Sequence, residues 1–594
     1  MNKPTRSNKL AQKLTPKTAN EQATVQPPST LTTQEYTRRS FLFTLANISG
    51  LIALGFGDAQ AAQEPAAAPG SVPPTPKTPA PAAVAPKNGL SFAPAKPFSY
   101  KSLIARAEEM AKNPYQAPPS PAADAIKTIN YDASGKIKFN PQDALWGKTG
   151  SVYPITFRPL GEYFPKSVAM NVVEGDQARM IEYRPDYFTM PEDSPLRQVP
   201  AGQSGISGFW VQRSRRIGDW TKSEPWATFQ GASYFRAISR QGQVGMSARG
   251  IAINTGLPQG EEFPDFRSFW FEPAANEGDP VVVYALLDGP SITGAYRFEL
   301  RFDGDTEMVI EKHLFIRKTI DQLGIAPLTS MFWYSETPNS HLRGWRPEVH
   351  DSDTLVGWRS DNEHFCRPLT NPPNLAYSAF VDEHPRGYGL LQRDRDPSHY
   401  LDGVGYEKRP SVWVEPIVDS KGNDNWGKGS ITLIEIPTND ETFDNIVAFW
   451  QIKGPALAGT ALQFKYRLYW TEHEPFFPRD QLARAVALRA GPGGNFGGSR
   501  PANTVKLVIE WDSHLFQGHQ PGDAVFTISS SAGKTDNIYI DWVAGTPRWL
   551  TQFDLFVDSD VPVELNGVLT LNGEVISETW LYQFHRQSFI QMMA

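Results

Sequence analysis

The chain has 594 residues, and 57 Lys and Arg face 64 Asp and Glu, so its formal net charge is -7. A protein that binds nucleic acid usually presents a basic face, and this acidic balance does not indicate one. Hydrophobic residues make up 40% of the chain and charged residues 20%. This composition excludes a disordered chain, and the length predicts more than one folded domain.

The first 61 residues have the order of an export signal. Paired Arg38 and Arg39 precede an uncharged, modestly apolar run over Phe41–Gly57, and small residues follow at Ala59-Gln60-Ala61. This order is typical of a twin-arginine signal peptide, which directs folded proteins to the periplasm. The run is short and partly polar, which makes it a poor membrane span, although an uncleaved anchor stays an alternative. We therefore predict a signal peptide over residues 1–61 and a periplasmic mature protein.

The next segments predict a spacer and one short helix. Residues 62–95 are rich in Ala and Pro, which is typical of a disordered linker. In Ser99–Lys112 the apolar residues Leu103, Ile104, Ala107 and Met110 recur at helical spacing and share one face. We expect an amphipathic helix there, at the start of the folded body.

Strand patterns dominate the rest of the body. Short segments of alternating apolar residues are separated by turn residues, and the clearest are Ser151–Leu160, Ser167–Val173, Gln243–Asn254, Pro280–Leu287, Ala295–Phe302 and Glu307–Ile316. Many short strands with few helical periods predict an all-β protein built on a large antiparallel sandwich. We expect this domain to occupy residues 96–475.

The C-terminal part predicts a second, smaller sandwich. Residues 476–503 form an expected linker, with a helix over Asp480–Arg489 and then a Gly-rich run. Further strands are expected at Thr504–Trp511, Ala524–Ser529, Asn537–Trp542, Gln552–Val557, Val563–Leu571 and Thr579–Phe584. Asn566-Gly567 and Asn572-Gly573 are turn signals. So many strands in residues 504–594 fit an immunoglobulin-like domain.

Two segments gather carboxylates among aromatic and basic residues, Arg346–Asp353 and Ile436–Asn445. Cleavage of a glycosidic bond needs two carboxyl groups, one to protonate the leaving oxygen and one to activate water or attack the sugar. The two segments therefore indicate a glycoside hydrolase. The alternative is that both are solvated acidic loops.

Other motifs carry less weight. Cys366 is the only cysteine, so no intramolecular disulfide forms; a buried thiol is expected in preference to a nucleophile. The histidines do not cluster at ligand spacing, and no EF-hand loop follows Asp351-Ser352-Asp353. We expect no metal and no cofactor, although a structural cation at Asp351-Ser352-Asp353 stays an alternative.

Long stretches along the mature chain resemble one family. They are Ala232–Arg236, Ser247–Gly250, Glu261–Pro264, Thr293–Phe298, Ala326–Phe332, Arg346–Ser352, Gly389–Arg393, Trp426–Ser430 and Glu435–Thr442. In these stretches the chain resembles the periplasmic glucan biosynthesis proteins of the G/D type, which act in making osmoregulated periplasmic glucans. The twin-arginine signal is more like that of the D-type members. The resemblance implies a mutarotase-like β-sandwich followed by an immunoglobulin-like domain.

The resemblance also implies a reaction, the inverting hydrolysis of β-1,2-glucan. Asp444 matches the position of the general acid and Asp351 that of the proposed general base, with Glu441 as a nearby carboxylate of the same site. Substrate-binding candidates, which supply stacking rings or polar groups, are Tyr234, Trp345, Glu348, His350, Trp358, Arg393, Tyr406, Arg409 and Trp413. Each ring is as compatible with core packing, and the arginines with structural ion pairs.

Two other classes of function stay open. A non-catalytic glucan-binding factor would guide the nascent chain from a membrane glucan synthase, with the immunoglobulin-like domain as a docking surface. A sugar epimerase or mutarotase rests on fold analogy alone. The expected partners are β-1,2-glucan or a related periplasmic glucan and the membrane synthase. A homodimer is left open, and no nucleic acid is expected.

Overall fold

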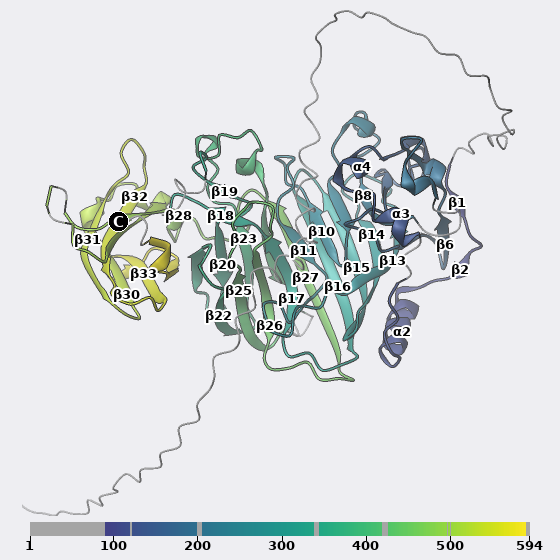
Figure 1. The fold of residues 1–594 in the computed structure, drawn as a ribbon. Coiled ribbons are helices and arrows are strands. Elements are labelled where there is room, and N and C mark those ends of the chain that lie inside the picture. Colours follow the sequence, from purple (N-terminus) through teal and green to yellow (C-terminus); the bar gives the residue numbers. More distant parts are fainter. Residues whose placement is uncertain are drawn as a thin grey trace, which may run out of the picture. The chain divides into compact units, whose positions relative to one another are not determined.

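A computed structural model describes residues 89–118, 122–198, 205–337, 344–418, 426–495, 497–498 and 500–589. The predicted signal peptide and nearly all of the Ala/Pro-rich spacer lie outside these residues. Within the described part of the chain, no helix is long and apolar enough to cross a membrane. The described residues belong to one compact unit, and most of them form β-sheets (Figure 1).

The first sheet of the large sandwich has ten strands. In hydrogen-bonded order they are β22 (Ala376–Glu383), β25 (Lys428–Glu435), β26 (Ile446–Ile452), β17 (Leu323–Ser330), β11 (Ser247–Arg249), β10 (Tyr234–Ala237), β9 (Ala227–Gln230), β8 (Ile206–Val211) and β4 (Ile155–Pro159), and β12 (Ala252–Ile253) also pairs with β17. Neighbours in this sheet run antiparallel. The sheet carries β10 and β11 near its middle.

The facing sheet runs through β6 (Gln177–Glu182), β5 (Ala169–Glu174), β13 (Asp265–Glu272), β14 (Val281–Asp288), β15 (Ile292–Phe302), β16 (Thr306–Ile316), β27 (Ala461–Thr471), β24 (Ser411–Pro416), β23 (Gly387–Leu391), β20 (Thr354–Trp358) and β21 (His364–Pro368). Its pairs are antiparallel except β13 with β5. Short strands β1 (Ser91–Phe92) and β2 (Lys96–Pro97) extend it at β6. Two small pairs lie outside both sheets: β18 (Phe332–Tyr334) with β19 (Val349–His350), and β3 (Lys138–Phe139) with β7 (Phe188–Thr189).

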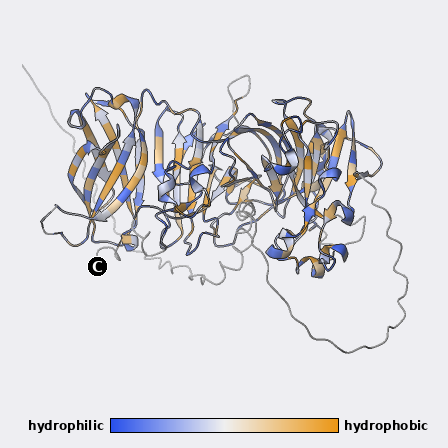
Figure 2. Cartoon of the chain, turned by 90° about the horizontal axis from the view of Figure 1, so that it is seen from above, coloured by the Kyte–Doolittle hydropathy of each residue, from blue (hydrophilic) through white to orange (hydrophobic). Residues whose placement is uncertain are grey.

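Alternation along the strands explains the sandwich. Every second residue of β16 is buried, from Thr306 through Ile316, and Figure 2 shows hydrophobic and hydrophilic residues alternating along many strands. Successive side chains of a strand point to opposite faces, so each sheet can bury one apolar face against the other. The inner faces form one contiguous core, in which Phe209, Phe229 and Phe298 are fully covered. The all-β sandwich predicted from the sequence is confirmed.

The predicted N-terminal helix is α2 (Tyr100–Ala111). Ser99 caps it, because its hydroxyl accepts a hydrogen bond from the backbone N–H of Ser102. The helix buries Leu103 and Ala107 against the outer face of β14 and β15, and the Thr293 hydroxyl donates to the Ala107 carbonyl (2.7 Å). The amphipathic pattern therefore predicted both the helix and its buried face. Two further helices, α3 (Ala123–Ile126) and α4 (Tyr131–Gly135), are short.

A second, smaller sandwich follows. One sheet has the order β28 (Arg484–Pro492), β29 (Thr504–Asp512), β32 (Trp549–Phe556) and β31 (Lys534–Trp542), and the other contains β30 (Ala524–Ser530), β33 (Val563–Leu571) and β35 (Thr579–Phe584), with β34 (Glu574–Val575) beside β33. Its core includes Trp511, Trp549 and Trp580. Strand β35 also pairs in parallel with β21 of the large sandwich. The domain boundaries themselves stay a prediction.

The helix predicted over Asp480–Arg489 is wrong. Residues 484–492 form strand β28, which is hydrogen-bonded to β29 along its length. The segment is rich in Ala, Leu and Arg, which favour helices, but such propensities are weak and tertiary pairing overrides them. Pairing with β29 buries Ala485 and Leu488 in the core of the smaller sandwich, which a free helix in a linker would leave exposed.

The two turn signals have different outcomes. Asn572 and Gly573 both have positive φ (53° and 86°) and connect β33 to β34, as a two-residue hairpin turn requires. The turn predicted at Asn566-Gly567 is wrong, because both residues lie inside β33. A Cβ at Gly567 would lie 2.6 Å from Cζ of Phe526, so close packing explains this glycine.

Candidate functional site

Asp444 lies at the end of the loop that joins β25 to β26, next to a strongly anchored asparagine. The Asn445 side chain accepts from the backbone N–H of Phe332 (2.8 Å) and donates to the carbonyls of Phe332 and Ile436 (3.0 Å each). These bonds fix the loop against the start of β18. Asp444 is buried, and its Oδ2 lies 3.7 Å from Nη2 of Arg236 on β10.

Asp351 follows β19 and is anchored to the same place. Its backbone N–H donates to the carbonyl of Met331 (2.8 Å), the residue before Phe332. Its carboxylate is fully buried and forms an ion pair with Nη1 of Arg409. Two aspartates 93 positions apart in the sequence are thus both anchored at the start of β18.

Arg409 links the two carboxylates electrostatically. Its guanidinium stacks over the ring of Tyr406, 4.1 Å from the ring centroid. Burial lowers the pKa of Arg409 to about 10, while the negative charge of Asp444 opposes that shift and the positive charge of Arg236 adds to it. The side chains of Asp351, Asp444, Arg236 and Arg409 therefore form one buried charged group, which we call the aspartate–arginine cluster.

Tyr234 borders this cluster on β10. The guanidinium of Arg249 lies 4.9 Å from its ring centroid, and Arg249 in turn donates to the Thr329 hydroxyl (2.6 Å). Burial raises the pKa of Tyr234 well above its usual value, and the charge of Asp444 is among the other influences on it. The Tyr234 phenol is therefore neutral beside Asp444.

Glu441 lies in a more open layer beside the cluster. Its Oε2 accepts from Nη1 of Arg346 (2.5 Å) and from the Tyr406 hydroxyl (3.2 Å), and Arg346 also contacts Asp402 (2.9 Å). The Glu441 side chain is 36% exposed. Since Tyr406 contacts both Glu441 and Arg409, this layer adjoins the aspartate–arginine cluster. Neighbouring Trp345 is 72% exposed, so its ring is available to a ligand.

Glu348 and His350 are buried behind this layer. The Nε2 of His350 lies 2.6 Å from Glu348 Oε2, and its Nδ1 lies 2.9 Å from Gln392 Oε1. The Gln392 amide donates to the Tyr406 carbonyl (3.0 Å). Burial raises the pKa of Glu348 to about 8, and the charge of Asp394 adds to the shift. The arrangement supports the backbone around Tyr406.

Three predicted substrate-binding residues lie elsewhere, against the smaller sandwich. Trp358 and Trp413 pack on the core of that sandwich, and Trp413 is covered by Gly387 at one edge. Arg393 is buried and pairs with Glu578 (2.5 Å) and Glu474 (3.0 Å). The structure therefore gives these three residues a packing or ion-pairing role between the sandwiches, the alternative that the sequence had left open.

Sequence reasoning assigned no role to three arginines of the site: Arg236, Arg249 and Arg346. All three stand inside stretches that carry the family resemblance, which was the available signal. Pattern alone could not separate them from structural arginines, because the acidic partners of Arg236 and Arg346 in the site lie far away in the sequence.

Comparison with known proteins agrees with this architecture. Residues 98–584 match the family described as "Periplasmic glucan biosynthesis protein, MdoG". The chain is 47% identical over 504 residues to glucans biosynthesis protein D 2 of Ralstonia nicotianae, an alignment that covers 83% of this chain and 91% of the relative. It is 41% identical over 540 residues to glucans biosynthesis protein D 1 of the same organism (87% and 96% covered).

A third relative, from another genus, gives the same result. The chain is 38% identical over 496 residues to glucans biosynthesis protein D of Xanthomonas oryzae pv. oryzae, with 82% of this chain and 90% of the relative covered. The family match spans both sandwiches, and each of these relatives aligns over most of its own length. The chain therefore belongs to the family of periplasmic glucan biosynthesis proteins.

Proposed function

We propose that this protein hydrolyses β-1,2-linked glucan during periplasmic glucan synthesis, by an inverting mechanism with two carboxyl groups. The observation that carries the proposal is the convergence of Asp351 and Asp444 on Arg409. Two carboxyl groups from distant segments in one buried group are what inverting hydrolysis needs, with about 6.5–9.5 Å between them for a water. Exposed Trp345, which precedes Arg346 in the chain, supplies a stacking surface.

The contacts favour Asp351 as the base and Asp444 as the acid. A guanidinium in direct contact stabilises the ionised form of a carboxyl group, and Arg409 contacts Asp351 in this way. Asp351 is therefore suited to accept a proton from water. Arg236 lies 3.7 Å from Asp444, beyond hydrogen-bond distance, so this arginine restrains protonation of Asp444 less. Protonated Asp444 would donate to the leaving glycosidic oxygen.

A direct test is incubation of residues 62–594 with linear β-1,2-glucan, followed by size analysis of the polymer. The proposal predicts progressive shortening by the wild type. Polymer that keeps its length while it binds the protein would instead support a binding role.

Trp345→Ala is expected to weaken glucan binding about tenfold while leaving the melting temperature unchanged. Stacking of a ligand on an exposed aromatic ring contributes about 1–2 kcal/mol, and a largely exposed side chain contributes little to folding. Titration calorimetry with a non-cleaved glucan in an Asp444→Asn background measures the affinity. Tyr377→Ala, which removes a half-exposed tyrosine on β22, is the matched control and should bind like its parent.

The second candidate is a glucan-binding factor without catalysis. The burial of both aspartates favours it, because a substrate must reach these carboxylates for hydrolysis and a bound guide strand need not. Such a factor would pass the nascent glucan from a membrane synthase, with the smaller sandwich as its docking surface. Cross-linking to membranes that contain the synthase tests this partner, and sedimentation tests the proposed homodimer.

We also propose export by the twin-arginine route. Replacing Arg38 and Arg39 together by lysine is expected to leave the uncleaved precursor in the cytoplasm, because paired arginines are the feature that identifies this class of signal. Fractionation and immunoblotting measure the distribution. Periplasmic accumulation of the double variant at the wild-type level would contradict the route.

A further inference from the structure

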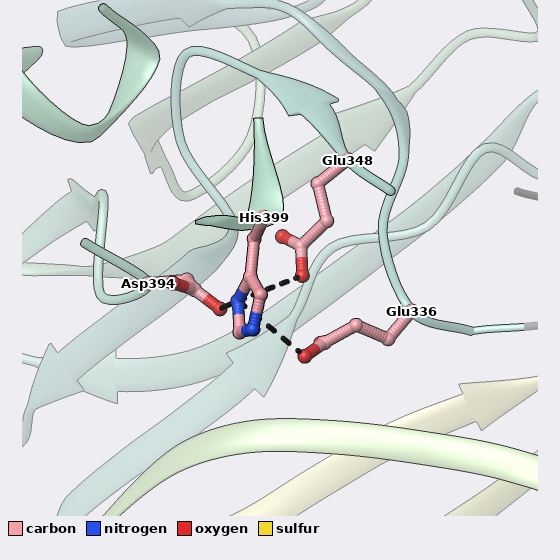
Figure 3. A group of neighbouring side chains, drawn as sticks. All are labelled: Glu336, Glu348, Asp394 and His399. Carbon is pink, nitrogen blue, oxygen red and sulfur yellow. Dashed lines mark hydrogen bonds and ion pairs between the residues drawn. The ribbon is translucent and has the colours of Figure 1, made fainter. Parts of the chain in front are cut away.

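A second charged cluster lies outside the aspartate–arginine cluster. It consists of Glu336, Glu348, Asp394 and His399, and one ligand atom of each lies within 4.8 Å of those of the others. Figure 3 shows the three carboxyl groups turned toward the imidazole of His399. Glu336 follows β18, Glu348 precedes β19, Asp394 follows β23, and His399 ends the short helix η7 (Pro397–His399). Three separate segments, which contain Glu336, Glu348, and Asp394 with His399, thus bring their side chains to one point.

One carboxylate oxygen in this cluster is left for a ligand. The Glu348 side chain is 1% exposed, and its Oε2 contacts His350. Among the described residues, no N–H or O–H group donates to its other oxygen, Oε1, and the nearest cation, His399 Nδ1, is 3.8 Å away. The carboxyl group of Glu336 lies close enough to share a hydrogen bond with Glu348 only when one of the two is protonated. Burying an ionised carboxylate oxygen that accepts no hydrogen bond costs folding free energy. A bound proton or a bound cation would offset that cost.

Glu348 also lines a small cavity with a volume of about 40 Å³. Four of its lining residues carry carboxyl groups, Glu336, Glu348, Asp353 and Asp394, and the others include Cys366, Leu369, Trp580 and residues of β28. Oδ1 of Asp353 is likewise buried and without a hydrogen bond inside the described part of the chain. A space of this size holds an ion with a water molecule, and four carboxyl groups border it.

The charges around the cavity do not balance. Four carboxyl groups line it, and the basic side chains beside them are His350, which contacts Glu348 (2.6 Å), His399, which contacts Asp394 (2.7 Å), and Arg489, which contacts Glu336 (2.9 Å). Even with both imidazoles protonated, one of the four carboxylates is left without a counter-charge.

We propose that this cluster is a binding site for a divalent cation of the size of Ca²⁺. Carboxylate oxygens are hard ligands, which Ca²⁺ binds at about 2.3–2.6 Å, so two ligands of one ion lie up to about 5 Å apart. The observed separations meet that limit without movement of the chain. The shorter bonds of Zn²⁺, about 2.0–2.1 Å, require a tighter set. His399 orients Asp394 through its hydrogen bond.

The ion would connect the two sandwiches. Glu348 lies three residues before Asp351, and Glu336 is held by Arg489 of β28 in the smaller sandwich. A cation at this point ties the segment that leads to Asp351 to a strand of the other sandwich. Its expected role is structural, and it does not depend on whether the aspartate–arginine cluster hydrolyses glucan.

The test uses residues 62–594 after removal of metal with a chelator. Calorimetric titration with CaCl₂ is expected to give one site per chain, and Ca²⁺ is expected to raise the melting temperature, since a ligand that binds only the folded state stabilises it. Glu348→Gln and the less buried Glu336→Gln are each expected to weaken Ca²⁺ binding at least about tenfold. Asp480→Asn is the matched control, because Asp480 also lies beside a histidine, His514, but on the surface.

Three results would overturn the proposal. One is a wild-type protein that shows neither binding heat nor thermal stabilisation with Ca²⁺. Another is a Glu336→Gln variant that binds Ca²⁺ as tightly as the wild type. The third is a loss of binding in Asp480→Asn equal to that in the cluster variants, which would place the ion elsewhere. The wild-type titration needs no variant, so the proposal stays testable even where a substitution prevents folding.

Discussion

Replacing Asp444 by Asn is expected to lower kcat for β-1,2-glucan hydrolysis about 10²–10⁴-fold, with the fold and the affinity for glucan retained. Asparagine keeps the size and polarity of the side chain but cannot deliver a proton to the leaving oxygen. The neighbouring Asn445 anchors the loop that carries Asp444, and the substitution leaves the hydrogen bonds of Asn445 intact. Steady-state kinetics on linear β-1,2-glucan, with circular dichroism as the folding check, measure the effect.

A matched control lies in the same loop. Asp440 is exposed and accepts a hydrogen bond from the backbone N–H of Thr442 (2.8 Å), so Asp440→Asn changes the same charge without touching the aspartate–arginine cluster. We expect it to keep kcat within about threefold of the wild type. An Asp444→Asn protein as active as the Asp440→Asn protein would remove Asp444 from the chemistry.

The second large effect concerns stability. Arg393→Met is expected to lower the free energy of unfolding by about 3–5 kcal/mol, because it leaves Glu474 and Glu578 buried without their shared cation. Glu578 also accepts a hydrogen bond from the backbone N–H of Ala485 on β28. Removing Arg393 is therefore expected to weaken the contact between the two sandwiches. Urea unfolding followed by tryptophan fluorescence measures the change, since Trp413 of the large sandwich and Trp580 of the smaller one lie in the same buried cluster.

The control for Arg393 is an ion pair of the same type in an open setting. Arg359 contacts Glu363 at 3.1 Å, and both side chains are about one third exposed (35% and 36%). Arg359→Met is expected to cost no more than about 1 kcal/mol, because solvent screens such pairs. Equal losses from the two substitutions would show that Arg393 acts as an ordinary surface arginine and not as a buried link.

The sequence predicted most of the fold because strand alternation is local. The segments expected to be strands each overlap a strand, and the pattern of Ser99–Lys112 predicted both α2 and its buried face. The error at Asp480–Arg489 arose where local preference and tertiary pairing disagree: the residues favour a helix, and pairing with β29 makes them a strand. The turn predicted at Asn566-Gly567 was wrong for a similar reason. The glycine there is explained by close packing against Phe526 and not by a turn.

The site was predictable only in part. Asp351, Asp444 and Glu441 were identified through family resemblance, and the structure brings them close to Arg409, Arg346 and Tyr406. Aromatic content alone could not separate Trp345, which is exposed, from Trp413, which is buried in a core. That distinction depends on which sheet face each strand turns inward, and pairing between distant strands decides it.

The central claim is that Asp351 and Asp444 carry out inverting hydrolysis. Its most direct test is proton NMR of the first products that residues 62–594 release from linear β-1,2-glucan, recorded before the new reducing ends equilibrate. Direct attack by water on the face opposite the leaving group converts a β linkage into an α-anomer, so the account predicts new α-anomeric reducing ends. Release of β-anomeric ends would contradict the two-carboxylate inverting mechanism, and the absence of any new reducing ends would contradict hydrolysis itself.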